Sequence, residues 1–359
     1  MISLPCTDPS DLPRATIPGF AQDLLASLLS NKGRTTEAIA QRRAALEKLE
    51  EILGPDHPEL QPSLDLLAID LLNLEDFASA TPILQRTYRY RVAQFGLEHP
   101  DTIGRLAVLT ECLFAAQLPA EAQPLLEKQL SLSERLKGPE HEDTLTAAHL
   151  LAKVYVQQGD RDSAEALLRQ AQASFERTLG PTHPKSLACL FALFDNLSEG
   201  PNFAAAKPWG DKLLSSSQLA FGPLHPLTIS AAEIVAELYA KLHDFAGAAT
   251  ILRQALAAFP RNPSGLTLEQ AELQWKLVVY LDSAGQSDEA EALARPAARA
   301  FRAHLGRDHA NTARAYFNLA RLSIRRSLRT PWGRFRWGCW RLLARCIQMT
   351  LGKWGRNGT

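Results

Sequence analysis

Hydrophobic and polar residues alternate with a helical period along most of the chain, most clearly in the stretch 144–180, TLTAAHLLAKVYVQQGDRDSAEALLRQAQASFERTLG. Its apolar positions form two stripes, Leu145, Leu151, Val154 and Tyr155 in the first and Ala164, Leu167, Leu168 and Ala171 in the second. Each stripe is one face of an amphipathic helix. The QQGDRDS segment between them carries glycine to end one helix and Asp or Ser to begin the next. The stretch therefore predicts a helical hairpin.

The pattern repeats every 42 residues. Alanine recurs at all seven equivalent positions, which are Ala38, Ala80, Ala122, Ala164, Ala206, Ala248 and Ala290. Six of seven connectors hold a glycine, at Gly54, Gly96, Gly138, Gly180, Gly222 and Gly306, and a histidine, at His57, His99, His141, His183, His225 and His309. A fixed period of this length indicates an array of supersecondary units that bury their apolar faces against one another. The recurring alanines are expected to be buried at helix crossings.

The recurring histidines are interpreted as parts of turns. A zinc site or a catalytic site needs His, Cys, Asp or Glu side chains that converge on one point, whereas these histidines are a whole repeat apart. We expect glycine to take the left-handed conformation at the end of one helix, proline to prevent its continuation, and histidine to form a hydrogen bond before the next helix. Thr267 replaces histidine in the sixth repeat. No metal ligand set is predicted.

The order L-A-x-x-Y, then G, then A-x-x-x-L, matched at Leu151, Ala152, Tyr155, Gly159, Ala164 and Leu168, resembles the tetratricopeptide repeat (TPR). A period of 42 also suits HEAT or armadillo helices, but the small residues at the helix crossings favour TPR. The longer unit and the LGPxHPxT connector resemble the kinesin light chain type of array. This resemblance implies an all-α, right-handed TPR superhelix (α-solenoid) of seven hairpins and one extra helix.

The organisation predicted from the sequence has three parts. Residues 1–17 form an N-terminal segment, residues 18–326 form the TPR array, and residues 327–359 form a basic C-terminal tail. The tail region from Arg325 carries nine Lys or Arg residues and no acid, and four of the six tryptophans. Three roles are open for it: a closing helix, an amphipathic helix on an anionic membrane surface, or an atypical terminus without a function. A further hypothesis is that the segment 334–356 docks in the groove as an autoinhibitor.

Composition places the chain among folded soluble proteins, with 46% hydrophobic and 22% charged residues. The sequence shows neither a signal peptide nor a run of about 18 apolar residues that would span a membrane, so a cytoplasmic location is expected. Five cysteines without close pairing favour reduced thiols, and Cys112 and Cys189 are expected to be buried. Nucleic-acid binding is not expected, because the basic residues gather in the tail without a recognised motif.

No motif for phosphate binding, nucleophilic catalysis or metal binding is present, so the favoured function is a non-catalytic scaffold that needs no cofactor. The resemblance implies that the first helix of each hairpin lines a concave groove for a peptide or helix of a protein partner. Transferred by the period, the groove positions are Asp23, Asp65, Asn73, Glu111, Phe114, His149, Lys153, Phe191, Asp195, Glu233, Glu237, Trp275, Lys276, Asp282, Phe317, Asn318 and Arg321. Acids outnumber bases in this set, which favours a basic partner.

An enzyme or a small-molecule sensor in the bore of the superhelix is the alternative function. Glu233 and Glu237 lie one helical turn apart and would act there as an acid and base pair or as cation ligands. The same spacing is common on ordinary helices, so the pair by itself does not decide between the two functions.

Overall fold

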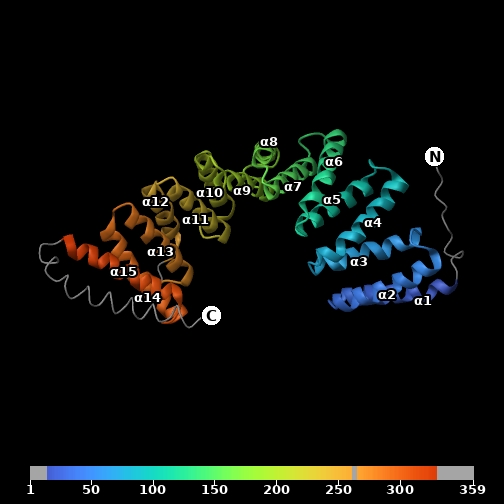
Figure 1. The fold of residues 1–359 in the computed structure, drawn as a ribbon, viewed down its shortest axis with the longest axis horizontal. Helices are drawn as coiled ribbons and strands as arrows, with labels where there is room; N and C mark the ends of the chain where they lie inside the picture. Colours follow the sequence, from blue (N-terminus) through green and yellow to red (C-terminus); the bar gives the residue numbers. More distant parts are fainter. Residues whose placement is uncertain (1–13, 261–264, 330–359) are drawn as a thin grey trace. The chain divides into compact units, whose positions relative to one another are not determined.

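The computed structural model describes residues 14–260 and 265–329, and in these residues it contains fifteen α-helices, three short 3-10 helices and no strand (Figure 1). The first helices of the hairpins are α1 (Ile17–Asn31), α3 (Gln61–Asn73), α5 (Pro100–Ala115), α7 (Glu142–Gln158), α9 (Pro184–Ser198), α11 (Pro226–Lys241) and α13 (Leu268–Ser283). The second helices are α2 (Thr35–Leu53), α4 (Phe77–Phe95), α6 (Pro119–Lys137), α8 (Arg161–Leu179), α10 (Lys207–Phe221), α12 (Phe245–Ala258) and α14 (Ser287–Leu305). A further helix, α15 (Ala310–Arg329), follows them. The prediction of seven hairpins and one extra helix is confirmed.

Helix starts follow the 42-residue period. From α5 onward, each first helix begins 42 residues after the previous one, at residues 100, 142, 184, 226, 268 and 310. The 3-10 helices η3 (Pro58–Leu60) and η4 (Phe203–Ala206) begin at the period positions where α3 and α10 begin three and four residues late. The hairpin is therefore the same unit in every repeat; α3 and α10 differ in the first turn, and α12 ends five residues before the period position.

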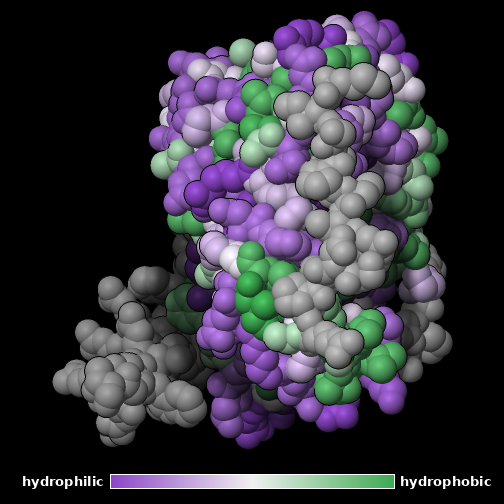
Figure 2. All heavy atoms as spheres, turned by 90° about the vertical axis from the view of Figure 1, so that its right-hand side faces the viewer, coloured by the Kyte–Doolittle hydropathy of each residue, from purple (hydrophilic) through white to green (hydrophobic). Residues whose placement is uncertain are grey.

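The chain divides into two compact units, Met1–Gly180 and Pro181–Thr359. In the first unit, the core includes Leu49, Leu71 and Leu113, and in the second it includes Leu252 and Leu281. Figure 2 shows the side of the molecule that lies on the right of Figure 1, where hydrophobic residues form separate groups among hydrophilic ones. The expectations for residues 1–13 and 330–359, including the tail, lie outside the described residues and stay predictions.

The seven recurring alanines are all completely buried, as predicted. A methyl group at each crossing allows the two helices of a hairpin to approach more closely than a larger side chain would permit. The two described cysteines, Cys112 and Cys189, are also buried, with free thiols. Burial raises the pKa of the Cys189 thiol to about 12, so this thiol is protonated and unreactive at neutral pH.

Six histidines form caps, which confirms their predicted role in the turns: His57 caps η3, and the others cap α5, α7, α9, α11 and α15. The Nδ1 atom of each accepts a hydrogen bond from the backbone N–H two residues later; for His183 the donor is Lys185, at 3.2 Å. Thr267 replaces histidine with a reciprocal capping box. Its Oγ1 accepts from the N–H of Gln270, whose Oε1 accepts from the N–H of Thr267. The sixth repeat thus keeps the cap with different chemistry.

The connector glycines differ from the expected left-handed helical conformation. At Gly54, Gly96, Gly138, Gly180, Gly222 and Gly306, φ is 82–94° and ψ is 157–174°. The φ angle is positive as expected, but ψ is extended, because the chain must leave the helix and run to the histidine cap. This combination is almost restricted to glycine. Only Gly159 among the glycines discussed so far is left-handed helical, in the turn inside the hairpin.

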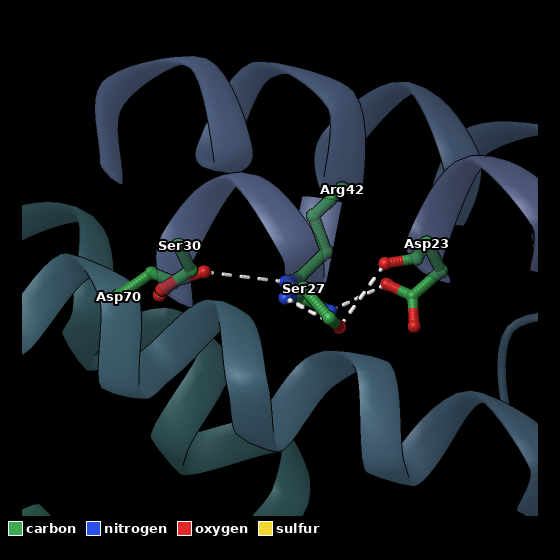
Figure 3. Close-up of polar contacts among 5 residues, drawn as sticks. All are labelled: Asp23, Ser27, Ser30, Arg42 and Asp70. Atoms are coloured by element: carbon green, nitrogen blue, oxygen red, sulfur yellow. Dashed lines mark hydrogen bonds and ion pairs between the residues drawn. The ribbon is translucent and has the colours of Figure 1, made fainter. Parts of the chain in front are cut away.

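A buried ion-pair cluster joins the first hairpin to the second (Figure 3). Arg42 of α2 is only 1% exposed, and its Nη1 donates to Asp23 of α1 at 2.6 Å. Its Nε donates to Asp70 of α3 at 3.3 Å, and its Nη2 donates to Ser27. Ser30 donates to the other oxygen of Asp70 at 2.6 Å. One guanidinium therefore bonds to three neighbouring side chains, two of which are carboxylates.

Replacing the buried alanine of the fourth hairpin is expected to destabilise the fold. Ala164→Leu inserts three carbon atoms at a crossing with no free space, and should lower the free energy of unfolding by roughly 1–3 kcal/mol. Urea denaturation followed by circular dichroism measures this. Ala173→Leu, at an exposed position of the same helix, is the matched control and should leave stability unchanged. Equal midpoints for the two variants would contradict the assigned packing.

The cap at α9 is expected to depend on a side-chain acceptor. His183→Ala removes the acceptor and should cost about 0.5–2 kcal/mol, whereas His183→Asn keeps one and should recover most of that loss. Thermal and urea denaturation of the two variants give the comparison. If alanine and asparagine destabilise equally, the contribution of His183 lies in packing and not in capping.

Breaking the Arg42 cluster is expected to have a large effect. Arg42→Ala leaves two carboxylates without their cation and should destabilise the first unit by about 3–5 kcal/mol. Arg34→Ala removes an exposed pair with Glu37 and serves as the control without a measurable change. Hydrogen exchange in α1–α3 locates the loss. Unchanged protection in the Arg42 variant would refute a role for this cluster in joining the hairpins.

Candidate binding surface on the first helices

All predicted groove residues lie on odd-numbered helices, and none of them is fully buried. We call the surface that these helices expose within each unit the first-helix face. In the first unit it comprises Asp23 on α1, Asp65 and Asn73 on α3, Glu111 and Phe114 on α5, and His149 and Lys153 on α7. In the second unit it comprises Phe191 and Asp195 on α9, Glu233 and Glu237 on α11, Trp275, Lys276 and Asp282 on α13, and Phe317, Asn318 and Arg321 on α15.

Two acids of the first unit serve the fold. Asp23 is held by Arg42, and Asp65 lies between Arg91 and Arg105 at 2.5 and 2.6 Å. Burial lowers the pKa of the Arg105 guanidinium, and the charge of Asp65 opposes that shift. Arg42 binds Asp23 within the first hairpin, whereas Arg105 of α5 connects Asp65 to the next hairpin. Carboxylates bound in this way are not available to a ligand.

The other part of the first-unit face is cationic and aromatic. Lys153 of α7 lies over the ring of Phe114 of α5, with its Nζ 4.6 Å from the ring centroid. Burial and, to a smaller extent, the positive charge of Lys153 lower the pKa of His149 to about 4, so His149 is neutral at pH 7. Glu111 and Asn73 are exposed. The sequence did not predict a contact between Lys153 and Phe114.

Ion pairs between successive first helices run along the second unit. Lys241 of α11 pairs with Glu199 after α9 at 2.8 Å, and Lys276 of α13 pairs with Glu233 of α11 at 2.7 Å. Arg321 of α15 pairs with Asp282 of α13 at 2.9 Å. Two acids of this face, Glu233 and Asp282, and the neighbouring Glu199 are therefore compensated by the protein's own bases. The excess of acids counted in the sequence does not produce an equally negative surface.

Glu237 is different, because it is exposed and forms no hydrogen bond or ion pair with the described residues. Its negative charge still acts on neighbours. It contributes to the raised pKa of Lys241, for which the hydrogen bond to Glu199 is the main cause. It also adds to the effect of burial in raising the pKa of the Tyr280 hydroxyl. Glu237 is thus an accessible carboxylate on this face.

A cavity of about 280 Å³ opens on the second-unit face, formed by α11, α13, α14 and α15. Its lining consists of Glu233, Glu272, Trp275, Lys276, Phe301, Asn311 and Arg314. Trp275 and Phe301 meet edge to face with ring centroids 6.3 Å apart, and form an aromatic wall. Glu272 and Arg314 are exposed and have no ion-pair partner among the described residues. The cavity therefore combines an apolar wall with an available acid, an available base and an amide.

Sequence reasoning identified three of the lining residues, Glu233, Trp275 and Lys276, and missed the other four. Glu272 and Arg314 occupy the same repeat position 42 residues apart, so the period was a signal that could have found them. Phe301 lies on the second helix α14, and no rule about first helices predicts its part in the cavity.

The arrangement gives little support to catalysis or metal binding. Glu233 is bonded to Lys276, so Glu233 and Glu237 do not form a pair of carboxylates that share a proton. Among the described residues, no group of three or more His, Cys, Asp or Glu side chains is placed to hold a metal ion. None of the helices in the described part of the chain combines the length and hydrophobicity that crossing a bilayer requires.

Comparison with known proteins agrees with this repeat architecture. A model of the tetratricopeptide repeat matches residues 20–91 and 107–177, and a second model of the same repeat matches residues 276–311. A search of curated proteins finds no match.

Several solved structures are similar to this chain. A Podosopora anserina protein named for the TPR-like repeats of kinesin light chain is 23% identical, with a TM-score of 0.49 over 59% of this chain and 100% of that chain. BtubC (BKLC) from P. vanneervenii is 18% identical, with a TM-score of 0.49 over 64% and 91%. A signal-transduction ATPase with a tetratricopeptide repeat sensor from Pyrococcus horikoshii is 14% identical, with a TM-score of 0.54 over 92% and 48%.

At 14% identity and a TM-score of 0.54, the Pyrococcus horikoshii structure supports the fold alone. The repeat matches, the seven hairpins and the period lead to one conclusion about the family. The chain belongs to the tetratricopeptide repeat proteins, with a 42-residue unit that resembles the kinesin light chain type.

Proposed function

We propose that this protein is a non-catalytic scaffold whose second-unit first-helix face binds a peptide or helix of a partner protein. The cavity with the aromatic wall of Trp275 and Phe301 is the observation that carries the proposal. Proteins of this repeat family generally act as scaffolds for protein interactions, and stacked hairpins offer an extended surface to such a ligand.

The size of the cavity supports a side chain as its occupant. Sites for small molecules usually measure about 300–1,000 Å³ and enclose most of the ligand. At about 280 Å³, this cavity is below that range, and several of its lining residues are exposed. One aromatic or branched aliphatic residue of a longer peptide fits these dimensions better than a whole metabolite does.

Neighbouring exposed residues extend the surface beyond the cavity. Val279 of α13 is 43% exposed and Phe317 of α15 is 51% exposed. They offer apolar contacts to residues that flank the anchor, as expected for an interface with an apolar centre and a polar rim. A peptide that crosses α13 and α15 would reach both.

Charge supports a partner with at least one basic residue. The acids at Glu199, Glu233 and Asp282 are already paired within the protein, so they add little attraction for a ligand. Glu237 and Glu272 are the accessible carboxylates near the cavity, and Arg314 is the accessible base. We therefore expect a hydrophobic anchor residue with a Lys or Arg beside it, and not a uniformly basic segment.

The test is a selection of peptides from a random display library on the purified chain, followed by affinity measurements. Trp275→Ala should weaken the selected peptides at least tenfold, because truncating a central aromatic residue costs about 1.4 kcal/mol or more. Trp209→Ala, in the second helix α10 of the same unit, is the matched control and should leave affinity unchanged. Glu272→Gln should weaken peptides with a basic residue and spare those without one.

Two results would contradict the proposed function. One is a set of selected peptides that bind the Trp275 and Trp209 variants equally well, which would place binding elsewhere on the chain. The other is a metabolite that co-purifies with the protein, is seen by native mass spectrometry, and is lost on Trp275→Ala. That result would favour the small-molecule sensor.

A further inference from the structure

The first helix α1 exposes a stripe of residues that is buried in the other first helices. In the second repeat this stripe consists of Leu60, Ser63, Leu67 and Asp70, each at most 3% exposed. The helix α2 of the preceding hairpin packs against α3 there. The equivalent residues 42 positions earlier are Pro18, Ala21, Leu25 and Leu28, and all four are exposed. Leu25 is 48% and Leu28 is 60% exposed.

The equivalents of these two leucines in later repeats show how unusual their exposure is. Of the residues equivalent to Leu25, Leu319 is half-buried, and the others are at most 3% exposed, namely Leu67, Leu109, Leu151, Leu193, Val235 and Leu277. Of the residues equivalent to Leu28, Tyr280 is half-buried, and the others are at most 3% exposed, namely Asp70, Cys112, Val154, Asn196, Leu238 and Leu322. The pairs α4 and α5, α6 and α7, α10 and α11, and α12 and α13 all pack together. The uncovered stripe of α1 is thus one half of a helix contact that the protein completes repeatedly elsewhere.

Two further residues widen this apolar surface. Ile17 is 63% and Leu24 is 67% exposed, and both lie next to the uncovered stripe on the helix. Burying a leucine or isoleucine fully is worth about 1.5–3 kcal/mol relative to leaving it exposed. A contiguous group of four large apolar side chains on one 15-residue helix is a candidate interface. We call Ile17, Leu24, Leu25 and Leu28, together with Pro18 and Ala21, the open face of α1.

The open face carries no net charge that would select a charged partner. The only charged residue within α1 is Asp23, and its carboxylate is bound by the buried Arg42. No like charges on α1 therefore oppose each other when two copies of this helix meet. A self-complementary apolar stripe on an uncharged helix favours an isologous contact, in which the same residues bury one another around a two-fold axis.

We propose that a second copy of this chain covers the open face, with the two α1 helices packed antiparallel about a two-fold axis. Each copy then supplies the apolar helix that the first hairpin of the other copy needs. The contact closes on itself, so it yields a dimer and not a filament. This proposal is independent of peptide binding on the second unit, because it uses different residues and a different surface.

Analytical ultracentrifugation of the full chain, over about 1–100 µM, tests the proposal. The wild type should sediment as a dimer at the upper concentrations. Leu25→Glu combined with Leu28→Glu should be monomeric throughout, because dimerisation would bury four carboxylates without partners. Leu219→Glu combined with Leu227→Glu is the matched control, with two leucines of the second unit that are 75% and 57% exposed, and it should remain dimeric.

A milder variant separates a loss of dimerisation from a loss of folding. Leu25→Ala combined with Leu28→Ala should keep the circular dichroism spectrum and weaken dimerisation at least tenfold, since both side chains are exposed in the single chain. A monomeric wild type would overturn the proposal, whether the open face is then left free, covered by another part of the chain or reserved for a different protein. A dimer that survives both leucine replacements would overturn it as well.

Discussion

A single hairpin of this protein cannot bury both faces of its helices, and the structure depends on neighbouring hairpins to do so. The fully buried alanines hold the two helices of each hairpin close together, and this closeness shapes the surface that the next hairpin covers. Within each of the two units, each second helix then packs on the following first helix. In such an array, the stability is the sum of the stabilities of the single hairpins and of the contacts between neighbouring hairpins. A substitution at one helix crossing therefore destabilises mainly the two hairpins that it joins. Leu25 and Leu28 on α1 are exposed because no helix in the described part of the chain covers them.

Polar groups are bound in two separate ways, by hydrogen bonds at the helix starts and by ion pairs between helices. At the helix starts, histidine or threonine side chains accept hydrogen bonds from backbone N–H groups that have no partner inside the helix. Between hairpins, charged side chains join helices, and these pairs range from the buried Arg42 cluster to the exposed pair of Lys276 with Glu233. The buried cluster holds hairpins together, whereas the exposed pairs on the second unit contribute little to stability. Their main consequence is to neutralise acids that would otherwise be available to a ligand.

The two candidate interaction surfaces differ in the chemistry they offer. The second-unit face provides an aromatic wall with one accessible base and two accessible acids, Glu237 and Glu272, which suits a peptide with an anchor and a charge. The open face of α1 provides apolar side chains without free charge, which suits another apolar helix. A dimer formed through α1 would use none of the residues of the second-unit face. Two copies of the same peptide site in one particle would strengthen binding to a partner that carries the motif twice.

The sequence alone determined the repeat, its unit of two helices, the burial of the recurring alanines and the capping role of the histidines. These features are local or strictly periodic, so one 42-residue unit contains the information for all of them. Tertiary structure decided which charges remain available, because the partner of Asp23 is 19 residues away and that of Asp282 is 39 residues away. Tertiary structure also places Phe301 in the wall of the cavity, which the sequence did not predict because this side chain comes from a second helix. Even the extended ψ of the connector glycines follows from where the next helix must begin, and a residue pattern specifies only that φ is positive.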